Sequence, residues 1–459
     1  MKSLIYILVV LLFLSCKDDE DIYVPVIPDV NQRTLAGGET TVFVSNFFSF
    51  ANPAPNLNAS NLELHLAGDG QFEQAFVTAP ATINSGSGPQ FNHVSCEGCH
   101  PTDGRSPFPE DDINGFSGFF LRTSIPGTDS CGGPNPVPGF GTQLQNHANV
   151  GVEPEVQFGI SYQDIPVTFA DGTVVTLRKP TYFIESSYIP FPSNAMLSPR
   201  IGPPVFGLGL LEAITEQDIL VKEDITDADG DGISGKANYV CNPETGSLEL
   251  GRFGWKANTP SVMVQNAGAS NDDMGVTNPL FPIESSFGQT NGDNLSDDPE
   301  ISQSTLDKLN IYLLTLGVPA ARELDDEEVA RGFYLFESAK CTACHTPKHV
   351  TGNYPDIPAI SNQTIYPYTD MLLHDMGEGL ADGRPDFLAN GNEWKTRPLW
   401  GIGLTETVNN HTNFLHDGRA RNLEEAILWH GGEAEDSKNY YTNLNERDRN
   451  ALLAFVNAI

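Results

Sequence analysis

Two stretches near the C-terminus have the hydrophobic spacing of amphipathic helices. Residues 325–339 and 444–459 each place large apolar side chains three or four positions apart, and the first stretch has acidic residues in its opening turn. The stripe residues are Val329, Phe333, Phe336, Leu452, Phe455, Val456 and Ile459. Any core-facing helix shows such a stripe, so the pattern predicts two helices that can pack across each other.

The chain before residue 321 shows more varied patterns. Residues 302–316 are amphipathic and predict a further helix, whereas residues 167–177 alternate around Asp171-Gly172, which is the signal of a β-hairpin. Proline-rich stretches flank the hairpin. These patterns predict a mainly α protein whose longer N-terminal part carries loop and β-hairpin insertions.

Residues 1–16 have the pattern of a lipoprotein signal peptide. One lysine precedes a short apolar run, and a small residue precedes Cys16, the expected lipidated N-terminus. An uncleaved membrane anchor is the alternative, although the run is short for a span. Residues 17–35 are polar and contain proline, so we expect a flexible tether. We therefore expect an exported lipoprotein of the cell envelope, anchored through its lipid to the membrane, at the periplasmic face or the surface of the outer membrane.

Length and charge narrow the classes of function. The 459 residues are too many for one small core and predict two or three domains. The 60 acidic and 25 basic residues give a formal net charge of −35, which excludes a nucleic-acid partner. The same charge favours a cationic electron-donor protein as a partner. Because the charges are spread along the chain, most of them also fit an ordinary solvated surface.

The seven cysteines fall into three groups. Cys16 belongs to the signal sequence, four cysteines belong to two Cys-x-x-Cys-His motifs, and Cys131 and Cys241 remain. An oxidising compartment would let this last pair form a disulfide, but sequence separation says nothing about distance in space. Their pairing therefore stays open. The first motif contains Cys96, Cys99 and His100, and the second contains Cys341, Cys344 and His345.

A Cys-x-x-Cys-His motif is the attachment signature of haem c. Two thioether bonds hold the porphyrin, and the histidine supplies an axial imidazole to the iron. Dithiol redox sites and zinc sites use parts of the same pattern. Two complete copies in an exported chain favour two covalently bound haem c groups, with His100 and His345 as iron ligands.

A coarse internal repeat supports two haem domains. Residues 200–214 and 397–408 each follow one motif and share the order proline, apolar, aromatic, glycine, apolar, glycine, leucine. Chance could produce this match, but duplication explains it better. We predict cytochrome c-like folds for an N-terminal haem c domain over residues 36–320 and a C-terminal cytochrome c domain over residues 321–459.

A run of alternating aspartates is a candidate calcium loop. Asp227, Asp229 and Asp231 have the 1, 3, 5 spacing of such a loop, and Gly232 lies at the sharp turn. Position 12 is Asn238 rather than the usual glutamate. The alternative is an acidic surface turn without an ion. The spacing favours a bound Ca²⁺.

Several long motifs accompany the two haem motifs. They are SPRIGPPVFGLGLLEAI, DADGDGISGKAN, GRFGWKA, YTDMLLHDMGEGLADG, EWKTRPLWGIGL and FLHDGRARNLEEAILWHGGEA. Together the motifs resemble those of the di-haem oxidoreductases described as peroxidases or thiol oxidoreductases, and the resemblance covers nearly all of the mature chain. It implies a distant relationship to bacterial di-haem cytochrome c peroxidases and to the di-haem enzyme that matures tryptophylquinone cofactors.

The resemblance implies that the two haems are unequal. In the related peroxidases, the N-terminal haem reduces peroxide and the C-terminal haem receives electrons. The tryptophan, glutamine and acid that complete their site match Trp255, Gln265 and Asp273, although the acid is a glutamate there. Asp273 could move a proton, Gln265 could stabilise the leaving hydroxide and Trp255 could relay electrons. Equally, Trp255 could be a core residue, and Asp273 a helix cap or a calcium ligand.

The first motif lacks the second histidine that follows it in the related peroxidases. No histidine occurs in residues 101–146, and His147 and Met196 are the next candidates. The iron of the N-terminal haem could therefore lack a second axial ligand in the resting protein.

The second motif also departs from the related peroxidases. Leu415 replaces the methionine expected before His416-Asp417-Gly418. Met376 is the preferred substitute, because a thioether ligand would raise the potential of a haem that receives electrons. The alternatives are His374 and His411, and Arg419 or Arg421 could pair with haem propionates.

Three functions remain open. The first is a lipid-anchored peroxidase-like enzyme that passes electrons from the C-terminal to the N-terminal haem and reduces peroxide or another small oxidant such as oxygen. The second is a non-catalytic electron carrier or sensor, and the third is oxidation of a protein or metal-ion substrate. The motifs and the resemblance favour the first.

Overall fold

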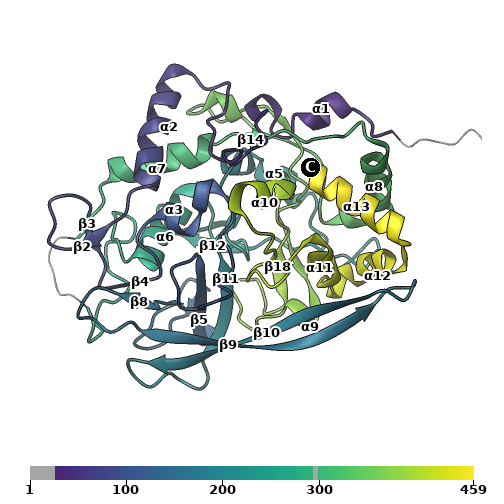
Figure 1. The fold of residues 1–459 in the computed structure, drawn as a ribbon. Helices are drawn as coiled ribbons and strands as arrows, with labels where there is room; N and C mark the ends of the chain where they lie inside the picture. Colours follow the sequence, from purple (N-terminus) through teal and green to yellow (C-terminus); the bar gives the residue numbers. More distant parts are fainter. Residues whose placement is uncertain (1–25, 293–297) are drawn as a thin grey trace, which may run out of the picture.

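The computed structural model describes residues 26–292 and 298–459 (Figure 1). The expected signal peptide with Cys16 and residues 17–25 of the expected tether lie outside them. The remainder of the tether lies on the protein, because Ile27 is buried and residues 30–34 form helix α1. No helix within the described residues is both long and apolar enough to cross a membrane.

The prediction of a mainly α protein is wrong. The structure is 29% helical and 21% strand, with many small sheets, and it does not show a cytochrome c-like fold. The chain's 43 glycines and 33 prolines favour short helices, because glycine weakens a helix and proline interrupts it. Strands β5 and β11 pair across a long stretch of sequence. Such pairing depends on tertiary packing and leaves little local signal.

Helices and strands alternate irregularly along the chain. The helices are α1 (Val30–Thr34), α2 (Ala59–Phe72), α3 (Cys96–Cys99), α4 (Leu208–Glu212), α5 (Glu216–Leu220), α6 (Val262–Met274), α7 (Gln303–Thr315), α8 (Glu327–Ser338), α9 (Gly377–Leu380), α10 (Thr405–Asn409), α11 (Leu423–Leu428), α12 (Glu435–Asn443) and α13 (Glu446–Ala458). The longer strands are β5 (Phe119–Thr128), β9 (Val156–Thr168), β10 (Val174–Ser187), β11 (Met196–Ile201), β12 (Tyr239–Asn242) and β13 (Ser247–Leu250). The strands of two or three residues are β1 (Thr41–Val42), β2 (Val77–Thr78), β3 (Ser85–Ser87), β4 (Gln90–Phe91), β6 (Pro134–Asn135), β7 (Gln143–Leu144), β8 (His147–Ala148), β14 (Val318–Pro319), β15 (His349–Val350), β16 (Thr364–Ile365), β17 (Leu373–Asp375) and β18 (Glu393–Lys395).

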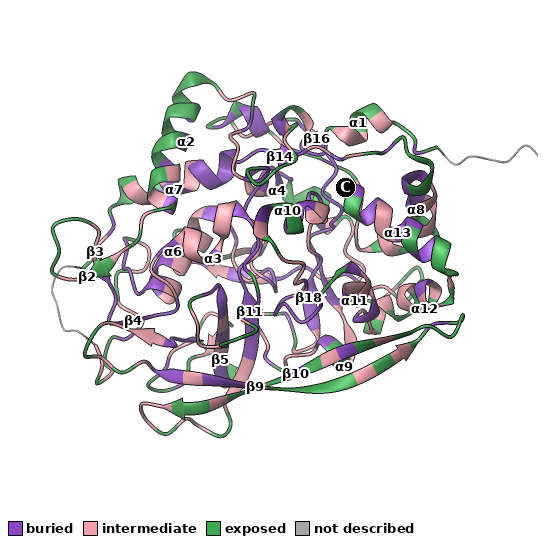
Figure 2. Ribbon diagram, in the orientation of Figure 1, coloured by how far each residue is buried: buried purple, intermediate pink, exposed green. Residues whose placement is uncertain are grey.

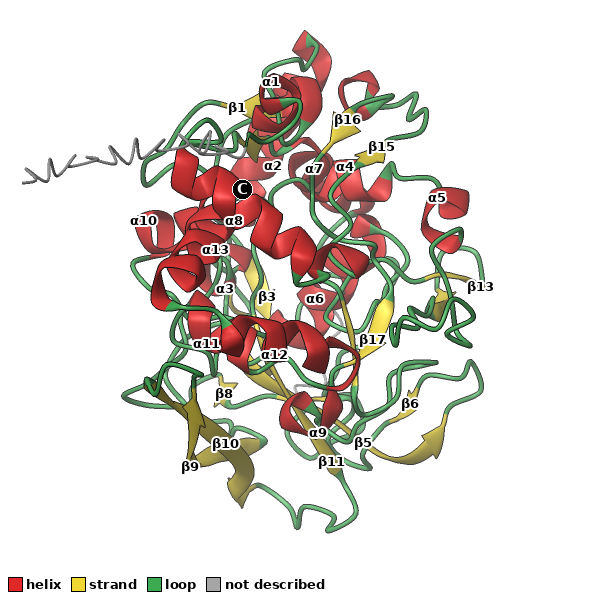
Figure 3. Ribbon diagram, turned by 90° about the vertical axis from the view of Figure 1, so that its right-hand side faces the viewer, coloured by secondary structure: helices red, strands yellow, loops and turns green. Residues whose placement is uncertain are grey.

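The structure confirms the three predicted amphipathic helices as α7, α8 and α13. The Asp326 side chain caps α8 by accepting hydrogen bonds from two backbone amides of its first turn. The aromatic rings of Phe333 and Phe336 lie 5.5 and 5.4 Å from the ring of Phe455 on α13. The apolar stripes of α8 and α13 therefore meet in one core, above the strands β9, β10 and β11 in Figure 3.

The predicted hairpin is longer than the sequence indicated. Strands β9 and β10 pair antiparallel from Thr168 and Val174 at the turn to Val156 and Ser187, and they form a twisted ribbon along the lower edge of the molecule (Figure 1). At its tip, the carboxylate of Asp171 pairs with the Arg449 guanidinium of α13 at 2.9 Å. This ion pair therefore joins the hairpin of the N-terminal part of the chain to the C-terminal helix α13.

A four-stranded sheet lies in the lower part of the molecule in Figure 3. Strand β5 pairs with β11, β6 and β7, and buried residues follow β5 and β11 through the middle of Figure 2. The last residue of β11, Ile201, is fully buried. Pro203, two residues after β11, contacts His100 of the first Cys-x-x-Cys-His motif.

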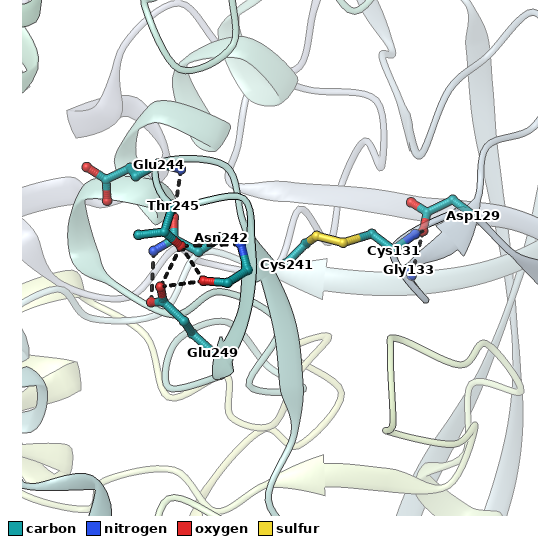
Figure 4. The surroundings of a disulfide bond; sticks show 9 residues. Asp129, Cys131, Gly133, Cys241, Asn242, Glu244, Thr245 and Glu249 are labelled. Atoms are coloured by element: carbon teal, nitrogen blue, oxygen red, sulfur yellow. Dashed lines mark hydrogen bonds between the residues drawn. A yellow bond between two sulfur atoms is a disulfide. The ribbon is translucent and has the colours of Figure 1, made fainter.

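A disulfide joins Cys131 and Cys241, the pair that the sequence left open (Figure 4). Their Cα atoms lie 6.1 Å apart across a sequence separation of 110 residues. The bond connects the loop after β5 to strand β12. It therefore ties together two distant segments of the N-terminal part.

Candidate functional site

The first motif forms one helical turn held by its neighbours. Ser95 caps α3, and its hydroxyl accepts a hydrogen bond from the backbone amide of Gly98. Nδ1 of His100 lies 2.7 Å from the carbonyl oxygen of Pro203. A Cβ atom at Gly202 would lie 2.4 Å from the carbonyl oxygen of Cys99, so only glycine allows this close approach. The Pro203 contact leaves Nε2 of His100 as the ring nitrogen available to iron.

The second motif repeats this arrangement. It follows α8 directly, and Nδ1 of His345 lies 3.0 Å from the carbonyl oxygen of Tyr368. Burial lowers the pKa of both His100 and His345 to about 4, so both rings are neutral at physiological pH. A neutral imidazole whose second nitrogen is held by a backbone carbonyl is the usual arrangement of an iron-binding histidine.

A cavity of about 250 Å³ lies beside the second motif. Cys341, Cys344 and His345 line it, together with mainly apolar side chains from both parts of the chain. Cofactor sites are typically apolar cavities with a few polar groups. The four motif cysteines are free thiols in the structure. The thiol pair, the oriented histidine and the apolar walls fit a haem.

The same geometry does not suit zinc. A zinc site needs three or four protein ligands. Within residues 26–292 and 298–459, every group of three or more close metal-ligating side chains is acidic. These groups are Asp224, Asp227 and Asp229, and Glu284, Asp298 and Glu300. The motifs therefore lack the further ligands that zinc would require.

Trp255 lies between the two motifs. Its indole Nε1 donates a 3.0 Å hydrogen bond to the carbonyl oxygen of Ile201, two residues before the Pro203 that holds His100. Its ring also lines the cavity that contains His345. The structure thus places the predicted relay residue in contact with the surroundings of both motifs.

Asp273 lies beside the first motif. Its backbone oxygen accepts hydrogen bonds from Asn92 and His93, shortly before the motif cysteines. Its carboxylate accepts a 2.5 Å hydrogen bond from the side-chain amide of Gln143. Desolvation raises the pKa of Asp273 to about 6, although the nearby Arg122 opposes the shift. The carboxylate can therefore gain or lose a proton near neutral pH.

The structure does not bring Gln265 into contact with Asp273. Both residues belong to α6, and eight residues at 1.5 Å per residue place them about 12 Å apart along the axis. The side-chain oxygen of Gln265 instead accepts a hydrogen bond from Thr259 at 2.8 Å. The amide that holds Asp273 belongs to Gln143 on β7, which no motif in the sequence singled out.

Two of the proposed sixth ligands at the second motif have no free nitrogen. His374 contacts Asp370 at 2.8 Å and Glu433 at 2.7 Å. Desolvation opposes its charge, yet these hydrogen bonds raise the pKa of His374 well above its ordinary value. His411 uses Nε2 toward the backbone of Arg105 and Nδ1 toward Asn413. Neither ring can bind iron without losing these contacts.

Met376, His416 and His430 line the cavity and are candidate ligands. His430 uses only Nδ1, toward the backbone oxygen of Ala426 at 2.8 Å. His416 stacks on Trp394 with ring centres 3.8 Å apart, and its Nε2 is buried without a hydrogen bond. The sequence suggested Met376 but gave no reason to select His416, because its environment depends on packing.

The acidic loop differs in part from its prediction. Asp227 and Asp229 lie together, but Asp224 completes the group in place of Asp231. Asn238 points elsewhere, since its buried amide donates to the carbonyl oxygens of Lys256 and Asp386. The 1, 3, 5 spacing therefore located the loop but not its full set of carboxylates.

Arg419 and Arg421 are both paired within the protein. Arg419 binds the Asp417 carboxylate at 2.9 Å, and Arg421 binds Glu425. These arginines are therefore less suited to haem propionates than the sequence implied.

Comparison with known proteins agrees with this geometry. Residues 30–459 match the family described as "Di-haem oxidoreductase, putative peroxidase". A search among curated proteins found no match. Because the family match covers nearly the whole chain, the protein belongs to the di-haem oxidoreductase family.

Proposed function

We propose that this protein is a peroxidase in which electrons enter at the haem of the second motif and peroxide is reduced at the haem of the first. The observation that carries the proposal is the Asp273 carboxylate beside the first motif, with its pKa of about 6. The acids nearest the second motif, Asp370 and Glu433, are bound to His374. Of the carboxylates of Asp273, Asp370 and Glu433, only that of Asp273, beside the first motif, is therefore poised for proton transfer.

The cofactors of the proposal are two covalent haem c groups. Cys96 and Cys99 would form one pair of thioether bonds, Cys341 and Cys344 would form the other, and His100 and His345 would bind iron. The haems would supply reversible one-electron storage. Together two electrons and two protons convert one peroxide molecule to two waters.

The protein groups at the first motif would move the protons. Asp273 would accept a proton from one peroxide oxygen and return it to the other as the O–O bond breaks. The amide of Gln143 holds this carboxylate in place. We therefore assign to Gln143 a positioning role near Asp273, while the proposed donor role of Gln265 has less geometric support.

Optical and electron paramagnetic resonance spectra with cyanide test the proposed function. We expect one high-spin haem that binds cyanide and reacts with peroxide, and one low-spin haem that does neither. Two low-spin haems that ignore both ligands would instead indicate an electron carrier or sensor. The same spectra measure whether the first iron is open at rest.

We propose Met376 as the sixth ligand of the second haem. A thioether ligand raises the reduction potential of haem iron, so Met376→Ala should lower the potential of one haem in a spectroelectrochemical titration. The matched variant is His416→Ala, which removes a second candidate ligand in the cavity. A potential that moves only in His416→Ala would transfer the ligand role to His416.

We also propose that the acidic loop binds Ca²⁺ through Asp224, Asp227 and Asp229. Calcium at 100 times its Kd would stabilise the folded state by about 2.7 kcal/mol, so EGTA should lower the thermal midpoint. Asp227→Asn should abolish this response, whereas Asp231→Asn, outside the group, should retain it. A midpoint that EGTA leaves unchanged in the wild type would rule out the site.

The expected lipoprotein export remains a proposal. The pattern of residues 1–16 supports this export. A second proposal is that the electron donor is a cationic protein, which the net charge of −35 supports. Mass spectrometry of the N-terminal peptide from membranes should find a lipid on Cys16. An intact Met1 N-terminus on the mature protein would contradict it.

A further inference from the structure

Besides the exposed Lys340, three cations line the cavity beside the second motif without a carboxylate partner. They are Arg105, Lys395 and Arg397. Nε of Arg105 donates to the backbone oxygen of Asn413 at 2.6 Å, and Nζ of Lys395 donates to that of Arg252 at 2.7 Å. The Arg397 guanidinium makes no hydrogen bond or ion pair within the described ranges 26–292 and 298–459.

The three charges are held where water solvates them poorly. Desolvation lowers the pKa of Arg105 to about 9 and that of Arg397 to about 10, and it lowers the pKa of Lys395 well below its ordinary value. Repulsion from Arg397 adds to the shifts of the other two. Burying unpaired charge is costly unless an anion compensates it. The cluster therefore indicates a bound anion.

Other buried cations nearby already have carboxylate partners. Arg200 and Lys256 share Asp382, at 3.3 and 2.8 Å. Arg419 likewise binds Asp417. Arg200, Lys256 and Arg419 therefore differ from the three cavity cations in having a carboxylate partner.

The cluster lies between the two haem motifs. Arg105 and Arg397 approach the ring of Trp255, at 5.3 and 4.8 Å from its centre. Desolvation has the largest influence on the pKa of His100 and lowers it, and the hydrogen bond to the Pro203 backbone opposes this shift. The charge of Arg397 comes next and lowers the pKa of His100 further. The cavity that the cations border also contains His345.

We propose that Arg105, Lys395 and Arg397 form a carboxylate-binding site that holds a propionate of the haem attached to Cys341 and Cys344. The inference rests on the two haem c groups of the proposed function. Arginine suits this role because its guanidinium binds a carboxylate through two parallel hydrogen bonds. Neutralising the propionate removes a negative charge near the iron, which stabilises the reduced state and raises its potential.

A redox titration of the haem-loaded protein tests the site. Because thioether bonds hold the haem covalently, Arg397→Leu should keep both haems and change only the potential. We expect at least a tenfold fall in the equilibrium constant for reduction of the second haem, which is about 59 mV for one electron. Arg397→Lys should retain most of the wild-type potential, because it keeps the charge.

Arg421→Leu is the matched control, since Arg421 pairs with Glu425 and its side chain is 42% exposed. Its potentials should match the wild type. If Arg397→Leu does not fold, Arg105→Leu takes its place. Unchanged potentials in the folded variant, or a fall confined to the first haem, would overturn the inference.

Two further measurements separate the possible causes of failure. Inorganic phosphate or acetate added to the wild type should leave the potentials unchanged, whereas a shift would assign the site to a free anion and overturn the propionate assignment. A pyridine haemochrome assay counts the haems. A chain without two haems would contradict both this inference and the proposed function, whereas an inert first haem would contradict the peroxidase proposal alone.

Discussion

Replacing Asp273 with Asn is expected to slow peroxide reduction by roughly 10²–10⁴-fold, the usual contribution of general acid–base catalysis. The amide is nearly the same size but cannot accept and return a proton. Both haems should stay attached, because Asp273 takes no part in the thioether bonds. Steady-state peroxide turnover with a reduced electron donor, beside a haem count, measures the effect.

Asp272→Asn provides the matched control one residue away. Asp272 pairs with Arg122 at 2.8 Å, and its side chain is partly exposed. The Asp272→Asn variant removes an equal charge from the same helix, so we expect it to lose only a little turnover. Equal losses in both variants would show that helix charge, rather than proton transfer by Asp273, matters.

The pH profile gives an independent check on Asp273. Desolvation raises its pKa to about 6, and only the ionised form can accept a proton. Wild-type turnover should therefore fall as the pH drops through about 6, and Asp273→Asn should lack this step. A wild-type profile without a change near that pH would argue against the assignment.

Removing the Cys131–Cys241 disulfide should give the largest loss of stability. The bond closes a loop across 110 residues, and the loop-entropy argument gives about 4.7 kcal/mol for a loop of about 100 residues, with typical losses of 2–5 kcal/mol. The double variant Cys131→Ser, Cys241→Ser should show this loss of unfolding free energy in a urea titration. Reduced wild type should unfold like the double variant.

The disulfide prediction fails if the double variant and the oxidised wild type unfold at the same urea concentration. The single variant Cys131→Ser is a useful comparison, because it leaves one free thiol but also opens the loop. It should be as unstable as the double variant.

Local patterns predicted the parts of the fold that local forces control. Helices α8 and α13 follow from stripes of apolar side chains and from the Asp326 cap, all within a few residues. The mainly α prediction failed because β5, β7 and β11 pair across distant segments. In the hairpin, only the residues nearest the turn alternate clearly, so its length was underestimated.

The candidate site shows the same division. The haem motifs are visible because all their chemistry lies within five consecutive residues. Gln143 and Arg397 reach their places through β7 and through the segment after β18, so their roles depend on tertiary structure. For Gln265, nearness in sequence was misleading. A motif predicted that Gln265 acts together with Asp273, but helix α6 holds the two residues about 12 Å apart along its axis.

The unequal roles of the two haems are the central claim, and anaerobic stopped-flow mixing of the fully reduced protein with hydrogen peroxide tests it most directly. We predict that both haems lose their electrons in a rapid reaction whose rate rises in proportion to peroxide, at two electrons per peroxide, and that this reaction slows in Asp273→Asn. Haems that stay reduced, or that oxidise equally fast without Asp273, would contradict the claim.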